Sequence, residues 1–207
     1  MSTDVRVVGL GGSLSATSTS LAALDAALDG AREAGASVSR FSVRELDLPF
    51  YAPGLPVPAQ VDELCDAVEA AHGMIWASPL YHGTVSGSFK NAVDWLQVLA
   101  QRGVPYLADK VVGLVATSGG VQGLQAINTM EFVVRALRGW AVPLVMPVPL
   151  AREAFDGEAN IVDHAVAAQL VGLGSEVTRA ARQLAASGTC DYGVQEPVAA
   201  SGERGGA

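Results

Sequence analysis

The chain has 207 residues, of which 50% are apolar and only 16% are charged, and its formal net charge is −8. This length corresponds to one domain with a complete hydrophobic core. Nucleic acids and anionic membrane surfaces bind clustered lysine and arginine, which this acidic, charge-poor chain lacks, so we exclude both as partners. The two cysteines, Cys65 and Cys190, are far apart without a CxxC spacing, which excludes a disulfide scaffold and a zinc site.

Short apolar runs alternate with helical patterns along the chain. We predict strands over 5–10, 38–43, 73–78, 111–116 and 141–146, and helices over 21–35, 61–71, 89–96, 122–138 and 160–184. Residues 45–58 contain four prolines and are predicted to form a loop. The polar start of the chain leads directly into a strand, so we expect no signal peptide and a cytoplasmic location.

Five apolar strands that alternate with helices are typical of a parallel sheet covered on both faces. The expected fold class is α/β, a flavodoxin-like doubly wound five-stranded parallel sheet with helices on both faces. Pro143 lies in the last strand and favours an edge position, where a missing N–H is tolerated. We expect one domain over residues 1–186 and a flexible tail over 187–207, which is rich in glycine.

Three stretches, 7–24, 70–89 and 111–130, contain no charged residue. Their glycine, serine, threonine and proline content argues against membrane helices. Each includes one predicted strand-to-helix turn, namely 11–20, 79–88 and 117–122. Because ligands of doubly wound sheets bind where the strands end, these turns predict a site for a large, mostly neutral, planar ligand.

The first turn carries six hydroxyl side chains in eight residues and precedes a helix. Free N–H groups and the dipole at a helix start attract anions, so a phosphate monoester is the natural ligand. The alternative is a serine-rich helix cap, for which one hydroxyl is enough. Residues 7–24 contain no lysine or arginine, so neutral donors must hold the phosphate. Neither the nucleoside triphosphate loop nor the nucleophile-elbow pattern fits these residues.

The second turn has the pattern Pro-x-Tyr-x-Gly-Thr over 79–84, followed by Gly-x-x-Lys-Asn-Ala-x-Asp-Trp over 87–95. This combination resembles the NAD(P)H-dependent FMN reductase family of flavodoxin-like flavoproteins. Gly12, Ser13 and Ser18 are in register with the phosphate loop of that family, and residues 117–120 resemble its second flavin-contacting loop. The resemblance extends from Val5 to about Val145.

The resemblance implies a set of cofactor-binding residues. The FMN phosphate would be bound by Ser13, Ser15, Ser18, Thr19 and Ser20. The isoalloxazine ring would be contacted by Pro79, Leu80, Tyr81, His82, Gly83, Thr117, Ser118, Gly119 and Gly120. The chain departs from the family at Ser15, where many relatives have arginine, and at His82, where most have asparagine. For His82 we favour a loop histidine that replaces asparagine over a proton donor near the ring.

The expected function is that of an FMN-dependent NAD(P)H oxidoreductase. A hydride would pass from the nicotinamide to flavin N5 and then to a quinone, azo compound, metal or free-flavin acceptor. No acid or base side chain is strictly required, the catalytic residues stay open, and we expect no metal site in the protein. The alternatives are a flavodoxin-like electron carrier and a flavin-binding biosynthetic or regulatory protein that does not turn over NAD(P)H. The low charge and the resemblance favour a homodimer or homotetramer. The acceptor and the preferred nucleotide stay open, with Arg102, Arg135, Arg138 and Arg152 as candidates for a nucleotide phosphate.

Overall fold

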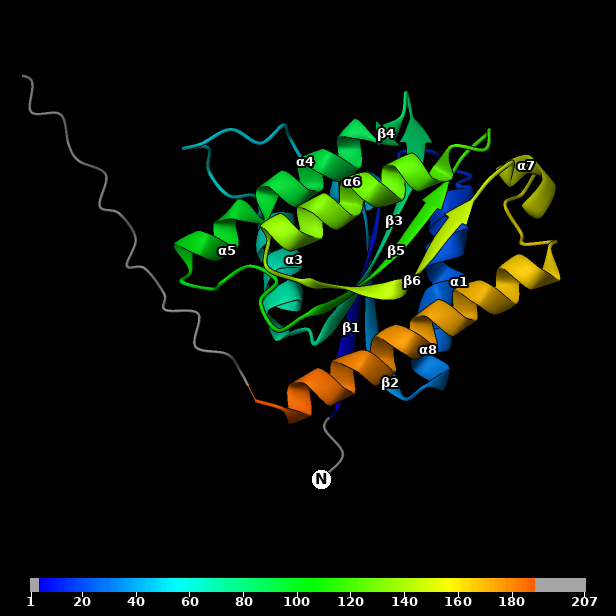
Figure 1. Cartoon of the computed structure of the whole chain (residues 1–207). Coiled ribbons are helices and arrows are strands. Elements are labelled where there is room, and N and C mark those ends of the chain that lie inside the picture. Colours follow the sequence, from blue (N-terminus) through cyan, green and yellow to red (C-terminus); the bar gives the residue numbers. More distant parts are fainter. Residues whose placement is uncertain (1–3, 189–207) are drawn as a thin grey trace, which may run out of the picture.

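The computed structural model describes residues 4–188, in which a central sheet lies between two layers of helices (Figure 1). The strands are β1 Val5–Gly11, β2 Ala36–Ser42, β3 Gly73–Tyr81, β4 Thr84–Val85, β5 Val111–Thr117 and β6 Trp140–Val148. The helices are α1 Thr19–Glu33, α2 Val43–Leu46, α3 Ala59–Ala70, α4 Gly87–Trp95, α5 Gln97–Gln101, α6 Gly123–Ala136, α7 Ala151–Ala154 and α8 His164–Ala186. The first three residues, Cys190 and the predicted tail from residue 189 lie outside the described part.

The strand order β2-β1-β3-β5-β6, with all neighbours parallel, confirms the predicted flavodoxin-like sheet. β6 lies at the edge, as Pro143 predicted. The β5–β6 register also shifts next to this proline, since Val112 pairs with Ala141 but Leu114 pairs with Val145. An edge strand with a local irregularity therefore accommodates the residue that has no N–H.

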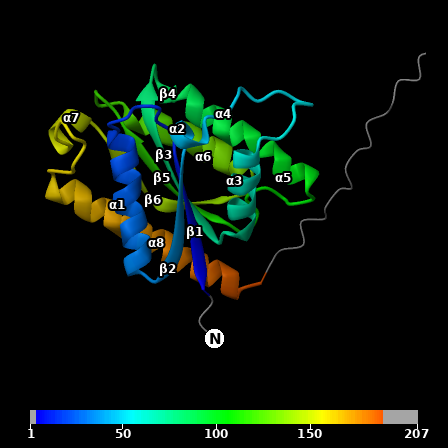
Figure 2. The same ribbon diagram turned by 180° about the vertical axis from the view of Figure 1, so that it is seen from behind.

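Helices α1 and α8 cover one face of the sheet, and α3, α4, α5 and α6 cover the other (Figures 1 and 2). Two glycines let α1 and α8 approach closely. A Cβ on Gly30 would lie 2.1 Å from the carbonyl oxygen of Val171, and one on Gly174 would lie 1.8 Å from that of Ala27. This backbone contact fixes the position of α1, whose first turn lies at the end of β1.

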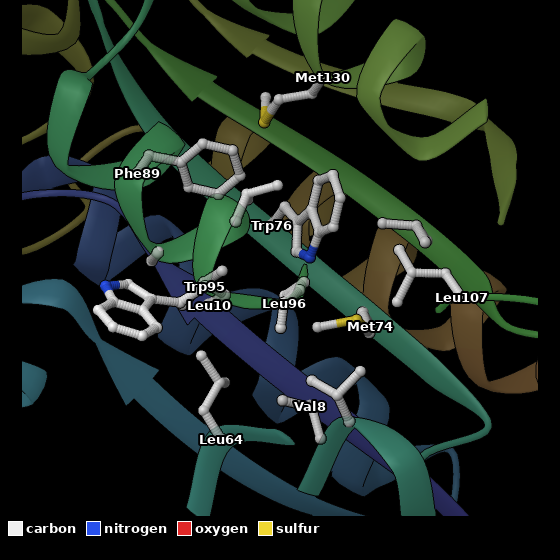
Figure 3. Packing of buried hydrophobic residues seen from close by; sticks show 14 of the residues in the cluster. Val8, Leu10, Leu64, Met74, Trp76, Phe89, Trp95, Leu96, Leu107 and Met130 are labelled. Carbon is white, nitrogen blue, oxygen red and sulfur yellow. The ribbon is translucent and has the colours of Figure 1, made fainter. Parts of the chain in front are cut away.

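Aromatic side chains fill the core beneath α3–α6 (Figure 3). The rings of Trp76 on β3 and Phe89 on α4 meet edge to face, with centroids 5.5 Å apart. Trp95 is also buried and donates its indole N–H to the carbonyl of Pro49 at 2.9 Å. Tyr51, in the proline-rich loop, contacts Trp95 edge to face. These contacts hold α4 and the loop after α2 against the sheet.

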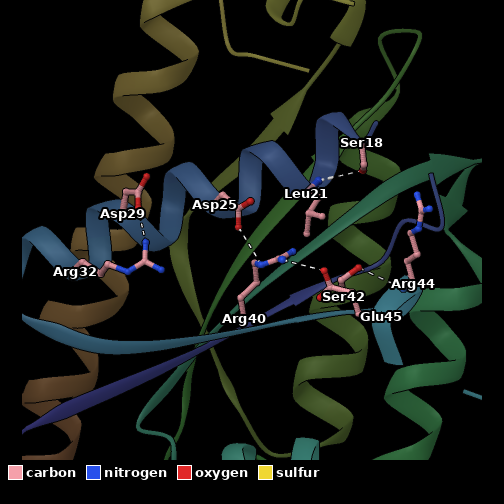
Figure 4. A network of polar contacts seen from close by, with 9 residues as sticks. All are labelled: Ser18, Leu21, Asp25, Asp29, Arg32, Arg40, Ser42, Arg44 and Glu45. Atoms are coloured by element: carbon pink, nitrogen blue, oxygen red, sulfur yellow. Dashed lines mark hydrogen bonds and ion pairs between the residues drawn. The ribbon is translucent and has the colours of Figure 1, made fainter. Parts of the chain in front are cut away.

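A chain of polar contacts joins α1, β2 and α2 on the outer side of the molecule (Figure 4). Arg40 on β2 lies 3.6 Å from the carboxylate of Asp25 and 3.1 Å from that of Glu45. Desolvation raises the pKa of Asp25, while the charge of Arg40 opposes this shift. Exposed ion pairs contribute only about 0–1 kcal/mol each, so this network serves mainly to align the elements.

β3 is longer than predicted, and this corrects the position of the second turn. The sequence placed the turn at 79–88, but Pro79, Leu80 and Tyr81 belong to β3. The chain then reverses at His82 and Gly83, and β4 pairs antiparallel with the end of β3. Both turn residues have positive φ, 49° and 84°, as a two-residue hairpin of the type I′ class requires.

Other elements also differ from the sequence prediction. Val43 begins the short helix α2 instead of ending a strand, because Ser42 caps that helix and accepts a hydrogen bond from the N–H of Arg44. The last helix starts at His164 and not at residue 160, since Asp163 is its N-cap and Ile161 pairs with Phe155. No helix within residues 4–188 is long and apolar enough to span a membrane.

Two titratable side chains, His72 and Lys110, lie at the amino ends of β3 and β5, opposite the three turns. Lys110 donates to the carbonyls of Glu69 and Ala71 at 3.0 and 2.8 Å, which satisfies the end of α3, and burial lowers its pKa. His72 accepts the N–H of Arg6 at Nδ1 over 3.1 Å. On α3, Cys65 is fully buried, and desolvation raises the pKa of its thiol to about 11.

The hairpin geometry yields a stability prediction for His82. A β-branched residue is strained at positive φ by about 1–3 kcal/mol, whereas asparagine is tolerated there. We expect His82→Val to lower the free energy of unfolding by about 1–2 kcal/mol and His82→Asn to leave it within about 0.5 kcal/mol of the original. Denaturant unfolding measures both. Equal stability of the valine variant and the original protein would contradict the observed turn.

The environment of His72 yields a pH prediction. Burial lowers its pKa, and the charges of Arg6 and Lys110 add to this shift, so the fold favours the neutral imidazole. His72 therefore binds a proton more readily in the unfolded chain than in the folded protein. The stability that the neutral imidazole contributes is lost as the pH falls from 6.5 through the lowered pKa of the folded state.

We expect the free energy of unfolding to fall more between pH 8 and pH 5 in the original protein than in His72→Gln. His82 and His164 are present in both proteins, so their effects cancel in the comparison. Parallel pH profiles of the two proteins would contradict the assignment.

Candidate cofactor-binding site

The carboxyl ends of β1, β3 and β5 lie at the upper end of the sheet in Figure 1. They form one wall of a cavity of about 260 Å³. The pairing of Gly11 with Ala77 and of Pro79 with Thr117 brings these strand ends side by side. The lining residues are Ser13, Ser15, Thr17, Ser18, Thr19, Ser20, Pro79, Leu80, Tyr81, Thr117, Ser118, Gly119 and Ala151. The three turns singled out in the sequence thus meet at one site.

The first turn supplies the donors of this cavity. Ser18 is the N-cap of α1 and accepts the N–H of Leu21 at 3.2 Å (Figure 4). The helix bonding begins with Ala22, which donates to the carbonyl of Ser18, so the N–H groups of Thr19 and Ser20 have no intrahelical partner. One serine caps the helix, and the other hydroxyls of this turn are not needed for that purpose.

The first and second turns are fastened to each other through Gly12. Its carbonyl accepts hydrogen bonds from the hydroxyls of Ser86 at 2.5 Å and Ser88 at 3.0 Å. A Cβ at this position would lie 2.6 Å from Cβ of Phe89, so only glycine fits. The hydroxyl of Ser78 in turn accepts the N–H of Ser86 at 3.0 Å. These contacts hold the start of α4 against the phosphate-loop candidate.

The second turn forms the exposed rim of the cavity. Tyr81 is 55% exposed, and the hairpin that follows it contacts α6 through a 3.1 Å hydrogen bond between Thr84 and Thr129. His82 and Gly83 do not line the cavity, although their neighbours in β3 do. They lie outside the β3–β4 pairing, so that pairing does not use their backbone N–H groups.

The third turn is held by the chain that follows β6. Ser118 donates its hydroxyl to the carbonyl of Gly120 at 2.7 Å. The N–H groups of Leu150 and Ala151 donate to the carbonyls of Gly120 and Ser118 at 3.0 and 2.9 Å. Thr117 also reaches the first turn, with 3.4 Å between its hydroxyl and that of Thr19. Gly120 itself does not line the cavity.

Sequence reasoning did not assign Thr17 and Ala151 to the site, and both line the cavity. Thr17 belongs to the hydroxyl-rich turn, so the composition of this turn could have indicated Thr17 as a site residue. Ala151 lies in α7, which packs on the third turn only after the chain has crossed β6, and no local pattern marks this contact. Within residues 4–188, no charged side chain lines the cavity, and no group of acidic, histidine or cysteine side chains could hold a metal.

Arg102, which the sequence offered as a candidate for a nucleotide phosphate, has other partners. Arg102 lies 2.6 Å from the carboxylate of Asp62 and 2.5 Å from that of Asp66, so it braces α5 against α3 and is not available to a nucleotide. Lys90 and Asp94 form a 2.6 Å ion pair along α4. Charge is thus used on the outer surface of the helices and is kept away from the cavity.

The donor set of the cavity fits FMN. A phosphate monoester needs several hydrogen-bond donors and a positive field, which the hydroxyl-rich first turn and the start of α1 supply. The isoalloxazine ring is planar and largely uncharged in its oxidised form, and the ends of β3 and β5 offer apolar and small residues beside it.

Comparisons with known proteins agree with this geometry. The chain is 31% identical over 150 residues to the NADPH-dependent FMN reductase ArsH of Acidithiobacillus ferrooxidans, a match that covers 69% of this chain and 62% of that relative. It therefore spans less than two thirds of the length of this curated relative.

Solved structures show the same fold. FerB, a flavoenzyme NAD(P)H:(acceptor) oxidoreductase from Paracoccus denitrificans, superposes with a TM-score of 0.68 at 21% identity and covers 86% of this chain and 98% of its own. The flavodoxin, WrbA-like protein from Agrobacterium tumefaciens superposes with a TM-score of 0.61 at 18% identity, and the match covers 87% of this chain and 99% of that protein. Residues 5–152 match the family model described as NADPH-dependent FMN reductase, and the chain belongs to that family.

Proposed function

We propose that this protein is an FMN-dependent NAD(P)H oxidoreductase. The observation that carries the proposal is the convergence of a hydroxyl-rich helix start and two neutral strand ends on one cavity, which has no charged lining residue in the described part of the chain. Bound FMN would accept a hydride from the nicotinamide at N5 and pass electrons to a quinone, azo, metal or free-flavin acceptor. The same proposal places the protein in the cytoplasm, where a free thiol such as Cys65 stays reduced.

The first turn would hold the phosphate. Ser13, Ser15, Ser18, Thr19 and Ser20 supply hydroxyl groups, and the first N–H groups of α1 add donors that point out of the helix. The helix dipole places about half a positive charge at this end. Fixed by its contact with α8, α1 would present these donors without reorganisation.

The second and third turns would hold the ring. Pro79, Leu80, Tyr81, His82 and Gly83 would surround one edge of the isoalloxazine, largely through backbone groups. Backbone N–H groups in the hairpin would stabilise the negative charge of a reduced flavin near N1 and O2, as in an oxyanion hole. The neighbouring loop would contribute Thr117, Ser118, Gly119 and Gly120. These residues orient and tune the cofactor, and none has to transfer a proton.

The proposal includes a homodimer or homotetramer. Val121, Leu124 and Phe132 are 72%, 50% and 74% exposed, an apolar stripe along α6 and the loop before it. Leu124 and Phe132 are eight residues apart and so lie on one side of the helix. The stripe borders the hairpin at the cavity rim, because α6 contacts β4 through Thr129. A second copy bound there would cover the stripe and close the open side of the cavity.

Binding and reduction test the activity directly. We expect the apoprotein to bind FMN with micromolar or tighter affinity and NAD(P)H to bleach the bound flavin anaerobically without another protein. Absence of FMN binding would contradict the proposal. Binding without reduction by NADPH or NADH would favour the electron carrier or the regulatory flavoprotein instead.

A single hydroxyl tests the phosphate site. Thr19→Val keeps the shape of the side chain and removes a donor, so FMN binding should weaken by about fivefold to tenfold, as expected for one hydrogen bond of roughly 1 kcal/mol. Riboflavin, which has no phosphate, should bind both proteins equally. Ser37→Ala, at the end of β2 that lies away from the cavity, is the matched control. Equal losses for FMN and riboflavin would place Thr19 away from the phosphate.

The apolar stripe gives a separate prediction for assembly. A carboxylate in a buried apolar interface is costly, so Phe132→Glu should shift the protein to a monomer in light scattering. Val162→Glu, at an exposed apolar position outside the stripe, should keep the original mass. A monomeric original protein, or an unchanged mass in Phe132→Glu, would refute this interface.

A further inference from the structure

Arg152 is the cationic residue next to the neutral cavity. It follows Ala151, which lines the cavity, in the first turn of α7. Two hydrogen bonds, from the N–H groups of Leu150 and Ala151, fasten this segment to the carbonyls of Gly120 and Ser118. The backbone of Arg152 therefore has a fixed position at the cavity wall, while its long side chain lies exposed to solvent.

The side chain of Arg152 is available to a ligand. Within residues 4–188 it forms neither an ion pair nor a side-chain hydrogen bond. By contrast, Arg40 and Arg102 are held by carboxylates on neighbouring elements. Among residues 4–188, no other lysine or arginine is the direct chain neighbour of a residue that lines the cavity.

The charge balance of the cavity calls for such a group. A phosphate monoester carries about −1.5 to −2 charges at pH 7, whereas a helix start offers only about +0.5. Hydroxyl groups add donors but no net charge, and the whole chain carries −8. A guanidinium group matches two phosphate oxygens at once and remains charged at every relevant pH.

We infer that Arg152 is a binding residue for the phosphate of FMN: its side chain turns from solvent over the cavity mouth and pairs with the phosphate held by the first turn. This inference rests on the proposed function. The contact between Thr19 and Thr117 supports it, because it places the phosphate-loop candidate beside the third turn, to which α7 is fastened. Arg152 would then favour FMN over riboflavin by a charge that the cavity lining lacks.

The test compares the affinities of FMN and riboflavin, measured by quenching of flavin fluorescence on titration with the apoprotein. Arg152→Gln should weaken FMN binding about fivefold and leave the affinity for riboflavin unchanged. A fivefold loss corresponds to one exposed charge pair of about 1 kcal/mol. Arg152→Lys should retain most of the FMN affinity. Arg179→Gln, on the exposed side of α8, removes the same charge far from the cavity and should change neither affinity.

Salt provides a second readout. The dependence of the FMN dissociation constant on salt concentration should be shallower in Arg152→Gln than in the original protein, because one charge pair is lost. The inference is overturned if Arg152→Gln leaves the affinity for FMN unchanged or weakens riboflavin binding as much as FMN binding. It is also overturned if Arg179→Gln weakens FMN binding as much as Arg152→Gln does. The inference would also be overturned if Arg152→Gln changed only the preference for NADPH over NADH and not the affinity for FMN. Failure of the original protein to bind FMN would overturn both this inference and the proposed function.

Discussion

The carbonyl group of Gly12 is the point on which the candidate site depends. It accepts hydrogen bonds from Ser86 and Ser88, while the absence of a side chain lets the backbone lie directly on Phe89. This contact joins the loop after β1 to the start of α4, and so sets the first turn relative to the second. Phe89 in turn packs on Trp76 in the core of the sheet. The geometry of the cavity is therefore built on the same packing that stabilises the fold.

A second constraint is the exclusion of charge from the cavity. Ion pairs occur on the outer surfaces, as at Arg40 and Arg102, and buried Lys110 lies at the opposite edge of the sheet. A neutral lining suits the flavin ring but leaves the phosphate with only hydroxyl groups and a helix start. Arg152 resolves this conflict if its guanidinium group stays in solvent while the cavity is empty and reaches the phosphate only when FMN binds. Burial of a permanent charge in the cavity is then avoided.

Much of this arrangement could be predicted from the sequence because its signals are local. Apolar strands predicted the parallel sheet, and Pro143 predicted its edge. The glycine- and serine-rich turns predicted which loops meet, because the carboxyl ends of parallel strands share one edge. The β3–β4 hairpin was not predicted, since His82 replaces the asparagine that usually marks such a turn. The contribution of α7 was also missed, because Ala151 reaches the cavity through hydrogen bonds to Ser118 and Gly120 that no sequence pattern reveals.

The most direct test of this account is a crystal structure of the protein with FMN. The account predicts the phosphate within hydrogen-bond distance of Ser13, Thr19 and the first N–H groups of α1. It also predicts the ring beside Pro79–Gly83 and Thr117–Gly120. A phosphate bound outside the first turn, or a ring bound away from these two strand ends, would contradict the account.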